Sequence, residues 1–173
     1  ISVCSNGFVA LGYDTSAPYS HSQLASSNGS SNMICGLWTD LNPSSGGSVR
    51  AYSDAASGLV VLAWINVPHY GSGTTETFEI IFGDPALYAT VTGDSPFLIQ
   101  YQSVGDASSC TIGHQNGSRN DGIQIAYNNS WASDLSPISD ASNFYMTTGT
   151  AALEPVGDLD AVIEGSALEL SWT

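Results

Sequence analysis

The residues of this sequence that could do chemistry are three histidines, three cysteines, scattered carboxylates and many serines. A serine nucleophile needs a histidine base and a third group that orients the histidine, often beside a Gly-x-Ser-x-Gly turn. No such turn occurs, and the histidines fall in expected loops or at expected strand ends: His21, His69 and His114. The pattern gives no support to nucleophilic catalysis, and we expect the protein not to be an enzyme.

Carboxylates offer two further chemistries, glycoside hydrolysis and metal binding. Glu76 and Glu79 are a candidate pair for hydrolysis, but their odd spacing places them on opposite faces of one strand. No His and Cys residues occur at zinc-ligand spacing. Calcium stays open as a cofactor, because six aspartates fall in expected loops, where they serve equally well as turn residues: Asp84, Asp94, Asp106, Asp121, Asp134 and Asp140.

The cysteines are odd in number, which allows one bridge and leaves one free thiol. Three pairings exist, and Cys4 with Cys35 is the first choice because both fall in expected strands near the start of the chain. The alternative is three buried thiols that behave as small apolar side chains. Candidate glycosylation sequons occur in three expected loops, at Asn28, Asn116 and Asn128.

The elements that must position these residues are strands, because apolar residues alternate with period two along most of the chain. Turn residues such as Asn6-Gly7 and Asn42-Pro43 separate the short apolar segments, and residues 14–32 are expected to form a long surface loop. The fold class predicted is all-β, an antiparallel β-sandwich or jelly roll over residues 1–150. Trp38 and Trp64 lie on apolar strand faces and are expected to anchor the core.

Charge excludes several classes of partner. The chain has two basic residues against 16 acidic ones, a formal net charge of −14 and a pI near 4.1. Nucleic-acid binding needs clustered Lys and Arg, so a nucleic-acid partner is excluded. The longest apolar run, residues 58–67, is about half of what a membrane-spanning helix needs, so no membrane insertion is expected. The Ser- and Gly-rich composition is typical of a secreted or cell-surface β-protein.

The last segment, residues 151–173, has a different character. A linker around Pro155 is followed by two short alternating stretches on either side of Gly165-Ser166. This predicts a two-stranded, hairpin-like tail, which is marginal in water unless it pairs with another sheet. The residues expected to form this assembly strand are Leu159, Ala161, Ile163, Leu168, Leu170 and Trp172.

Six segments in one order carry a family resemblance: residues 1–12, 34–41, 60–68, 77–82, 99–101 and 110–113. The series resembles the β-sandwich, nidogen-like modules of large secreted bacterial surface proteins and peptidases. The tail resembles the start of a fibronectin type III segment, in which a strand ends in Ser-Trp. The resemblance implies a secreted structural or accessory module, and its motifs are fold-determining rather than catalytic.

Two functions follow as expectations. The first is a non-catalytic extracellular structural or adhesive protein, a pilus-like building block of a surface filament assembled by β-strand pairing between subunits. Its partners are further copies in a homopolymer or tandem modules. The alternative is a carbohydrate- or calcium-binding accessory module of a secreted bacterial enzyme, with glycans as partners.

Overall fold

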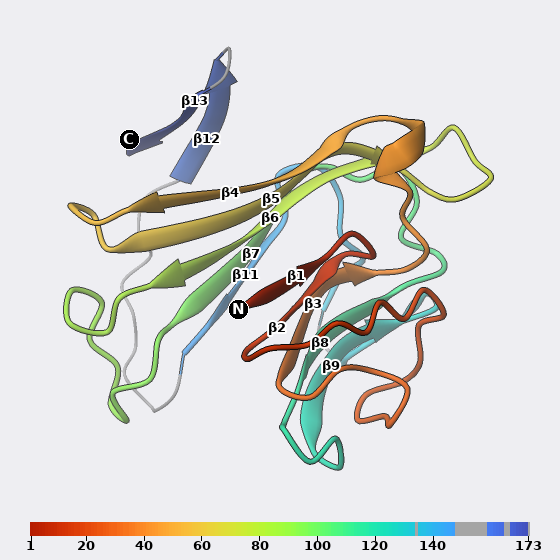
Figure 1. Ribbon diagram of the computed structural model, residues 1–173, viewed down its shortest axis with the longest axis horizontal. Helices are drawn as coiled ribbons and strands as arrows, with labels where there is room; N and C mark the ends of the chain where they lie inside the picture. Colours follow the sequence, from red (N-terminus) through yellow and green to blue (C-terminus); the bar gives the residue numbers. More distant parts are fainter. Residues whose placement is uncertain (134, 148–158, 165–166, 173) are drawn as a thin grey trace.

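The chain forms two antiparallel β-sheets that pack against each other, as Figure 1 shows for the computed structural model. The structure describes residues 1–133, 135–147, 159–164 and 167–172, with the backbone alone for the last two ranges. Within these residues the helical structure is limited to one 3-10 turn, η1 (Pro43–Ser45). The predicted all-β antiparallel sandwich is thus confirmed.

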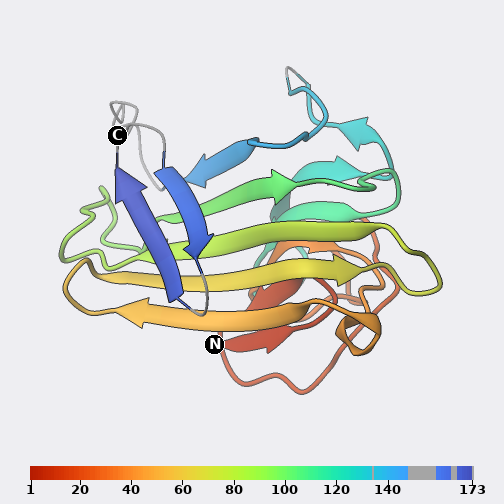
Figure 2. The ribbon, with the colours of Figure 1, turned by 90° about the horizontal axis from the view of Figure 1, so that it is seen from above.

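The first sheet has the strand order β1-β2-β3-β8-β9-β10. Its strands are β1 (Ser2–Cys4), β2 (Phe8–Ala10), β3 (Met33–Trp38), β8 (Thr111–Gln115), β9 (Gly122–Tyr127) and β10 (Ser130–Trp131). The second sheet has the order β11-β7-β6-β5-β4. Its strands are β4 (Ser48–Asp54), β5 (Leu59–Pro68), β6 (Thr75–Gly83), β7 (Phe97–Ser103) and β11 (Asn143–Met146). Figure 2 shows the second sheet face-on, with β4 to β7 running as a meander.

The core between the sheets is centred on aromatic residues of the second sheet. The rings of Trp64 and Phe78 stack with centroids 4.8 Å apart and planes 7° from parallel. Trp64 is fully buried, and its Nε1–H donates to the carbonyl oxygens of Cys4 at 3.2 Å and Ser5 at 3.1 Å. The indole therefore ties β5 to the end of β1 and satisfies its only polar group inside the core.

A β-bulge in β3 determines which of its side chains face the other sheet and which face outward. The N–H groups of Gly36 and Leu37 both donate to the carbonyl oxygen of Gly7, at 3.0 and 3.1 Å. The pairing register with β8 shifts between Cys35 and Trp38. Because a bulge puts two residues where the partner has one, Leu37 joins the core between the sheets while Trp38 packs on the outer face.

Residues 14–32, expected to be a surface loop, form a cover over the outer face of the first sheet. Trp38 has no exposed surface, stands edge-on to Phe8 at 6.0 Å, and donates from Nε1 to the Pro18 carbonyl at 2.8 Å. The side chain of Gln115 holds the same loop by accepting from Ser26 N–H at 2.8 Å and donating to the Ser30 carbonyl at 2.8 Å. This segment closes a second, smaller apolar cluster on that face.

Gly7 gives a stability test with a matched control. Its φ is +81°, and a Cβ built on it would lie 1.9 Å from the Leu37 carbonyl oxygen. Gly71 has a similar φ of +71° but open space around the same position. We expect Gly71→Ala to lose about 1 kcal/mol of unfolding free energy for the left-handed backbone alone. Gly7→Ala should lose about 3 kcal/mol or more, because it also displaces the bulge.

Urea unfolding followed by tryptophan fluorescence measures both values. Equal losses in the two variants would contradict the close approach of Gly7 to β3.

Candidate functional site: a cleft between the sheets

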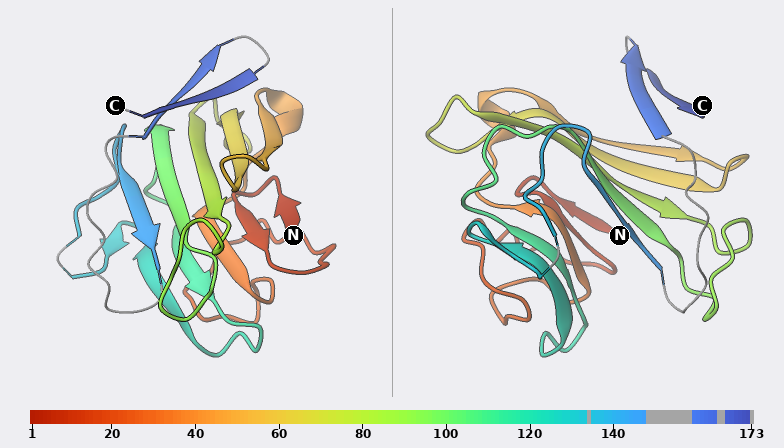
Figure 3. Two further views of the ribbon diagram at one scale, coloured as in Figure 1. Left: turned by 90° about the vertical axis from the view of Figure 1, so that its left-hand side faces the viewer. Right: turned by 180° about the vertical axis from the view of Figure 1, so that it is seen from behind.

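A cleft of about 960 Å³ lies between the two sheets. The sheets diverge toward this cleft, as Figures 1 and 3 show from opposite sides. The volume lies in the range of ligand-binding pockets in proteins. The cleft is lined by the residues just before β1 and just after β2, by the start of β3, by the β4–β5 turn, by the ends of β6 and β7 that face each other, and by the β8–β9 hairpin.

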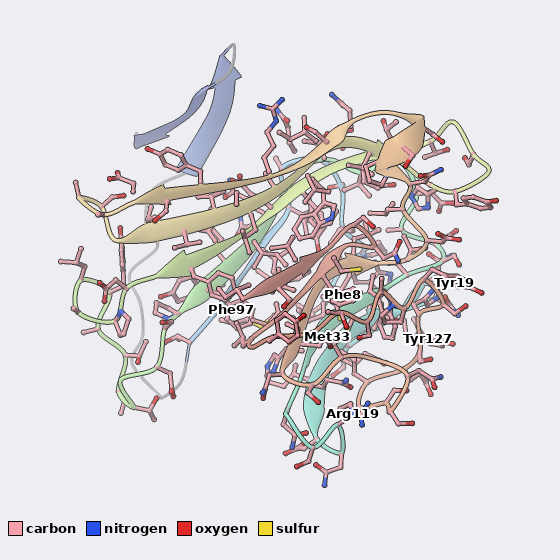
Figure 4. All side chains as sticks on the ribbon, viewed as in Figure 1. Phe8, Tyr19, Met33, Phe97, Arg119 and Tyr127 are labelled. Atoms are coloured by element: carbon pink, nitrogen blue, oxygen red, sulfur yellow. The ribbon has the colours of Figure 1, made fainter. Side chains whose placement is uncertain are left out.

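The cleft has two largely apolar walls, each a row of residues paired across one sheet. On the first sheet, Ile34 is paired with His114, and His114 with Ile123. On the second sheet the paired row consists of Ser53, Val60, Phe82 and Phe97. Figure 4 shows Phe97 on β7 at this wall. Apolar side chains that face each other across an open cleft favour an apolar occupant.

His114 is the titratable group in these walls. Its ring meets the ring of Phe97 edge-on, with centroids 6.0 Å apart and planes at 89°. Burial lowers the pKa of His114 below its usual 6.5, and the nearby charge of Asp121 opposes this shift. Desolvation disfavours the imidazolium, so the imidazole is neutral at neutral pH and the wall carries no cation there.

Carboxylates stand at the rim of the cleft, but each is engaged in its own turn. Asp54 accepts from Ala56 N–H at 2.9 Å, Asp84 from Ala86 N–H at 2.8 Å, and Asp121 from Gly122 N–H at 2.8 Å. Short-range acceptance of this kind is the usual turn role of aspartate. The rim is therefore acidic and pre-formed.

The loop aspartates considered for calcium do not converge on one point. Asp106 accepts from Ser108 N–H at 2.8 Å, and Asp140 from Val104 N–H at 2.9 Å. Among the described residues no three His, Cys, Asp or Glu side chains gather closely enough to hold a metal ion. Asp94 accepts from the Thr92 hydroxyl at 2.6 Å, and Asp134 lies outside the described residues.

Glu76 is a buried carboxylate whose role sequence reasoning missed. Its side chain has no exposed surface and lies 2.7 Å from His69 Nε2. It also accepts from the N–H groups of Gly105 at 3.0 Å and Asp106 at 2.7 Å. These bonds join β6 to the loop that leads from β7 to β8. A glutamate that alternates with apolar residues in the sequence gives no signal of such distant partners.

Glu79 lies on the opposite, outer face of β6, so the two glutamates do not share a site. It pairs with Ala63 on one side and Gln100 on the other, and Gln100 Nε2 donates to its Oε1 at 2.6 Å. Burial raises the pKa of Glu79 to about 7, and the bond from Gln100 opposes the shift. A carboxyl with this pKa is partly protonated at neutral pH.

The three cysteines are all free and buried, so the predicted bridge between Cys4 and Cys35 is absent from this structure. Phe8 of β2 is paired with Cys4 on one side and Cys35 on the other. Two strand spacings amount to about 10 Å, whereas a disulfide needs Cα atoms within about 7 Å. Burial raises the pKa of all three thiols, well above the usual value for Cys35 and to about 12 for Cys110.

The candidate glycosylation sites are exposed, and their side chains bond to nearby loops. Asn28 Nδ2 donates to the Ser22 hydroxyl at 3.0 Å, and Asn116 Nδ2 donates to Asn120 Oδ1 at 2.9 Å. Asn128 Oδ1 lies 2.6 Å from His21 Nε2. Glycosylation stays a prediction for all three.

The tail forms the backbone hairpin β12 (Leu159–Glu164) and β13 (Ala167–Trp172). Its register pairs Leu159 with Trp172, Ala161 with Leu170, and Ile163 with Leu168. Directly paired residues share a face of a two-stranded sheet, and the faces alternate along it. The six residues predicted to form the assembly strand therefore occupy a single face.

Comparison of the chain with protein-family models, with curated proteins and with solved structures finds no match. The resemblance to nidogen-like and fibronectin type III modules therefore stays a prediction. Within the described part of the chain, no helix has the length and apolar character needed to cross a membrane.

Thiol chemistry tests the state of the cysteines. With their pKa values raised by burial, the folded protein should not react at pH 8 with an aromatic disulfide reagent. After unfolding in guanidinium without reductant, three thiols per chain should react. Fewer than three after unfolding would contradict the free thiols described here.

A pH series tests the environment of His114. Its lowered pKa means that the folded chain binds this proton more weakly than the unfolded chain does. The contribution to stability is present above the unfolded pKa of about 6.5 and is lost as the pH falls toward the folded pKa. We expect His114→Gln to remove this loss. Glu79 acts in the opposite sense: because its pKa is raised to about 7, it adds stability to the folded protein as the pH falls below that value. The measured quantity is therefore the difference in stability between wild type and variant at each pH.

Unfolding midpoints between pH 8 and pH 5 give this difference. A difference that does not change over this range would contradict the burial of His114.

Proposed function

We propose that this protein is a non-catalytic, extracellular structural or adhesive module that joins to further copies of itself through β-strand contacts. The observation that carries the proposal is the tail, whose register gathers six apolar positions on one face. The other face holds Asp160, Val162, Glu164, Ala167, Glu169 and Ser171. A two-stranded hairpin with one apolar face is marginal alone and needs a surface to cover it.

The second support is an edge strand able to accept another strand. β4 has seven residues and pairs with β5 without a register shift. In the described residues it ends its sheet, so no strand lies along its outward edge. Unpaired N–H and C=O groups along an edge are the template for strand addition.

The position of the cleft is a third observation that supports the proposal. Trp64 of β5 bonds to Cys4 and Ser5, so β5 lies over the end of β1. The two sheet edges β1 and β4 thus lie on one side of the sandwich, as the end-on view in Figure 3 (left) shows. An incoming strand beside β4 would have the apolar walls of the cleft next to it.

Charge limits the kind of contact that can form. Each copy has 16 acidic residues and only two arginines, so ion pairs cannot make up most of the contacts between copies. Backbone pairing and apolar contacts must supply it, and added salt should help by screening repulsion between acidic copies.

Two substitutions of the same kind in the tail test this function. Leu170→Asp places a charge on the apolar face of the hairpin, and Val162→Asp places one on the opposite face. We expect Leu170→Asp to abolish assembly, because burying a carboxylate costs several kcal/mol. Val162→Asp should assemble like the wild type.

Electron microscopy and light scattering of the full-length chains measure assembly, with the truncation of residues 159–173 as the reference for complete loss. Fibres that persist in the truncated protein, or equal loss in both aspartate variants, would contradict the proposal.

A further inference from the structure

A second hollow, smaller and polar, lies beside the cleft and has a different character. Its volume is about 480 Å³, and it lies between the segment after β2, the residues before β3 and the β8–β9 turn. The polar groups that line it include Asp14, Ser16, Ser30, Asn32 and Arg119. Tyr13 stands at this hollow with 93% of its surface exposed, more than any other large apolar side chain of the described residues.

The backbone around the hollow is fixed by bonds between distant segments. Leu11 N–H donates to the Asn32 carbonyl at 2.9 Å, and Asn32 N–H donates to the Asn116 carbonyl at 3.3 Å. Asp14 N–H donates to the Ser2 hydroxyl at 2.9 Å. The hollow is thus pre-formed by three parts of the chain, which lowers the entropic cost of binding.

The hollow contains one charged donor, Arg119, and one charged acceptor, Asp14. Arg119, which Figure 4 shows at the β8–β9 turn, donates from Nη1 to the Ser27 carbonyl at 3.0 Å. A guanidinium has five N–H donors, so donors remain for a ligand. Asp14 accepts from the N–H and hydroxyl of Ser16 at 2.7 and 2.6 Å. These bonds, with Ser30 and the charge of Arg119, lower the pKa of Asp14 and keep it an acceptor.

The charges identify the class of ligand. Asp14 and Arg119 lie at the same hollow without forming an ion pair within 4 Å, so a ligand hydroxyl can accept from one and donate to the other. The hollow is close to neutral, whereas the chain as a whole carries −14 and repels anions. Hydroxyl-rich neutral ligands fit this arrangement, and anionic ones do not.

The exposed tyrosine completes the recognition of such a ligand. The ring faces of Tyr13 are apolar and in contact with water at the edge of a polar hollow. A pyranose presents an apolar C–H face and a polar rim of hydroxyls, and the C–H face stacks on an aromatic ring. We propose that the hollow formed by Tyr13, Asp14, Asn32 and Arg119 binds one or two residues of a neutral glycan.

Saturation-transfer NMR on the full chain tests the site with lactose, cellobiose, mannobiose and chitobiose, and with sialyllactose as the anionic probe. We expect transfer to at least one neutral disaccharide. Tyr13→Ala should weaken binding about tenfold or more, and Tyr13→Phe should retain it because the ring faces remain. Tyr19→Ala is the matched control, since Tyr19 is 62% exposed and does not line the hollow.

The two arginines give a second matched pair. Arg119→Gln should weaken binding about tenfold, and Arg50→Gln should not, because Arg50 lies on β4 away from the hollow. Unchanged circular dichroism and unfolding midpoints show that each variant is folded. The proposal is overturned if no neutral probe binds, if only sialyllactose binds, or if Tyr13→Ala and Arg119→Gln bind like the wild type.

Discussion

The difference in strand length between the two sheets governs the shape of this molecule. β5 has ten residues and β6 nine, whereas the central strand of the first sheet, β3, has six. At about 3.4 Å per residue, β5 extends some 14 Å farther than β3 can follow. Sheets also twist, so faces that pack closely at Trp64 and Phe78 separate toward the other end. The apolar cleft is the consequence of this mismatch.

Local sequence patterns predicted much of the fold, because alternation of apolar and polar residues indicates a strand and Gly, Asn, Asp and Pro indicate turns. The burial of Trp38 and Trp64 follows from such patterns, and so does the single apolar face of the tail. The bulge at Gly36 and Leu37 does not, since it depends on the approach of the Gly7 carbonyl from the turn between β1 and β2. The pairing of Cys4 with Cys35 was preferred because both lie in strands near the start of the chain, but β2 lies between these two strands, and the structure has the alternative of three free thiols.

The candidate sites were harder to predict than the fold. Glu76 bonds to a segment 30 residues away in sequence, and Gln115 bonds to one 89 residues away. No rule of sequence spacing connects such positions. The polar hollow likewise needs Tyr13 and Arg119, which are distant in sequence, to line the same space. Both arginines nevertheless lie at surfaces with a proposed role, Arg50 on the open edge strand and Arg119 in the hollow. Because the chain has so few cationic side chains, the positions of these two limit the surfaces at which a partner can find a charged donor.

The free cysteines have a consequence for the conditions in which this chain can fold. A sandwich held by hydrogen bonds and apolar packing alone folds to the same end point in reducing and oxidising surroundings. Its folding needs no oxidase or isomerase to set covalent pairings. Its buried sulfurs are also withdrawn from oxidants once folding is complete. The native fold is therefore independent of the redox state of its surroundings.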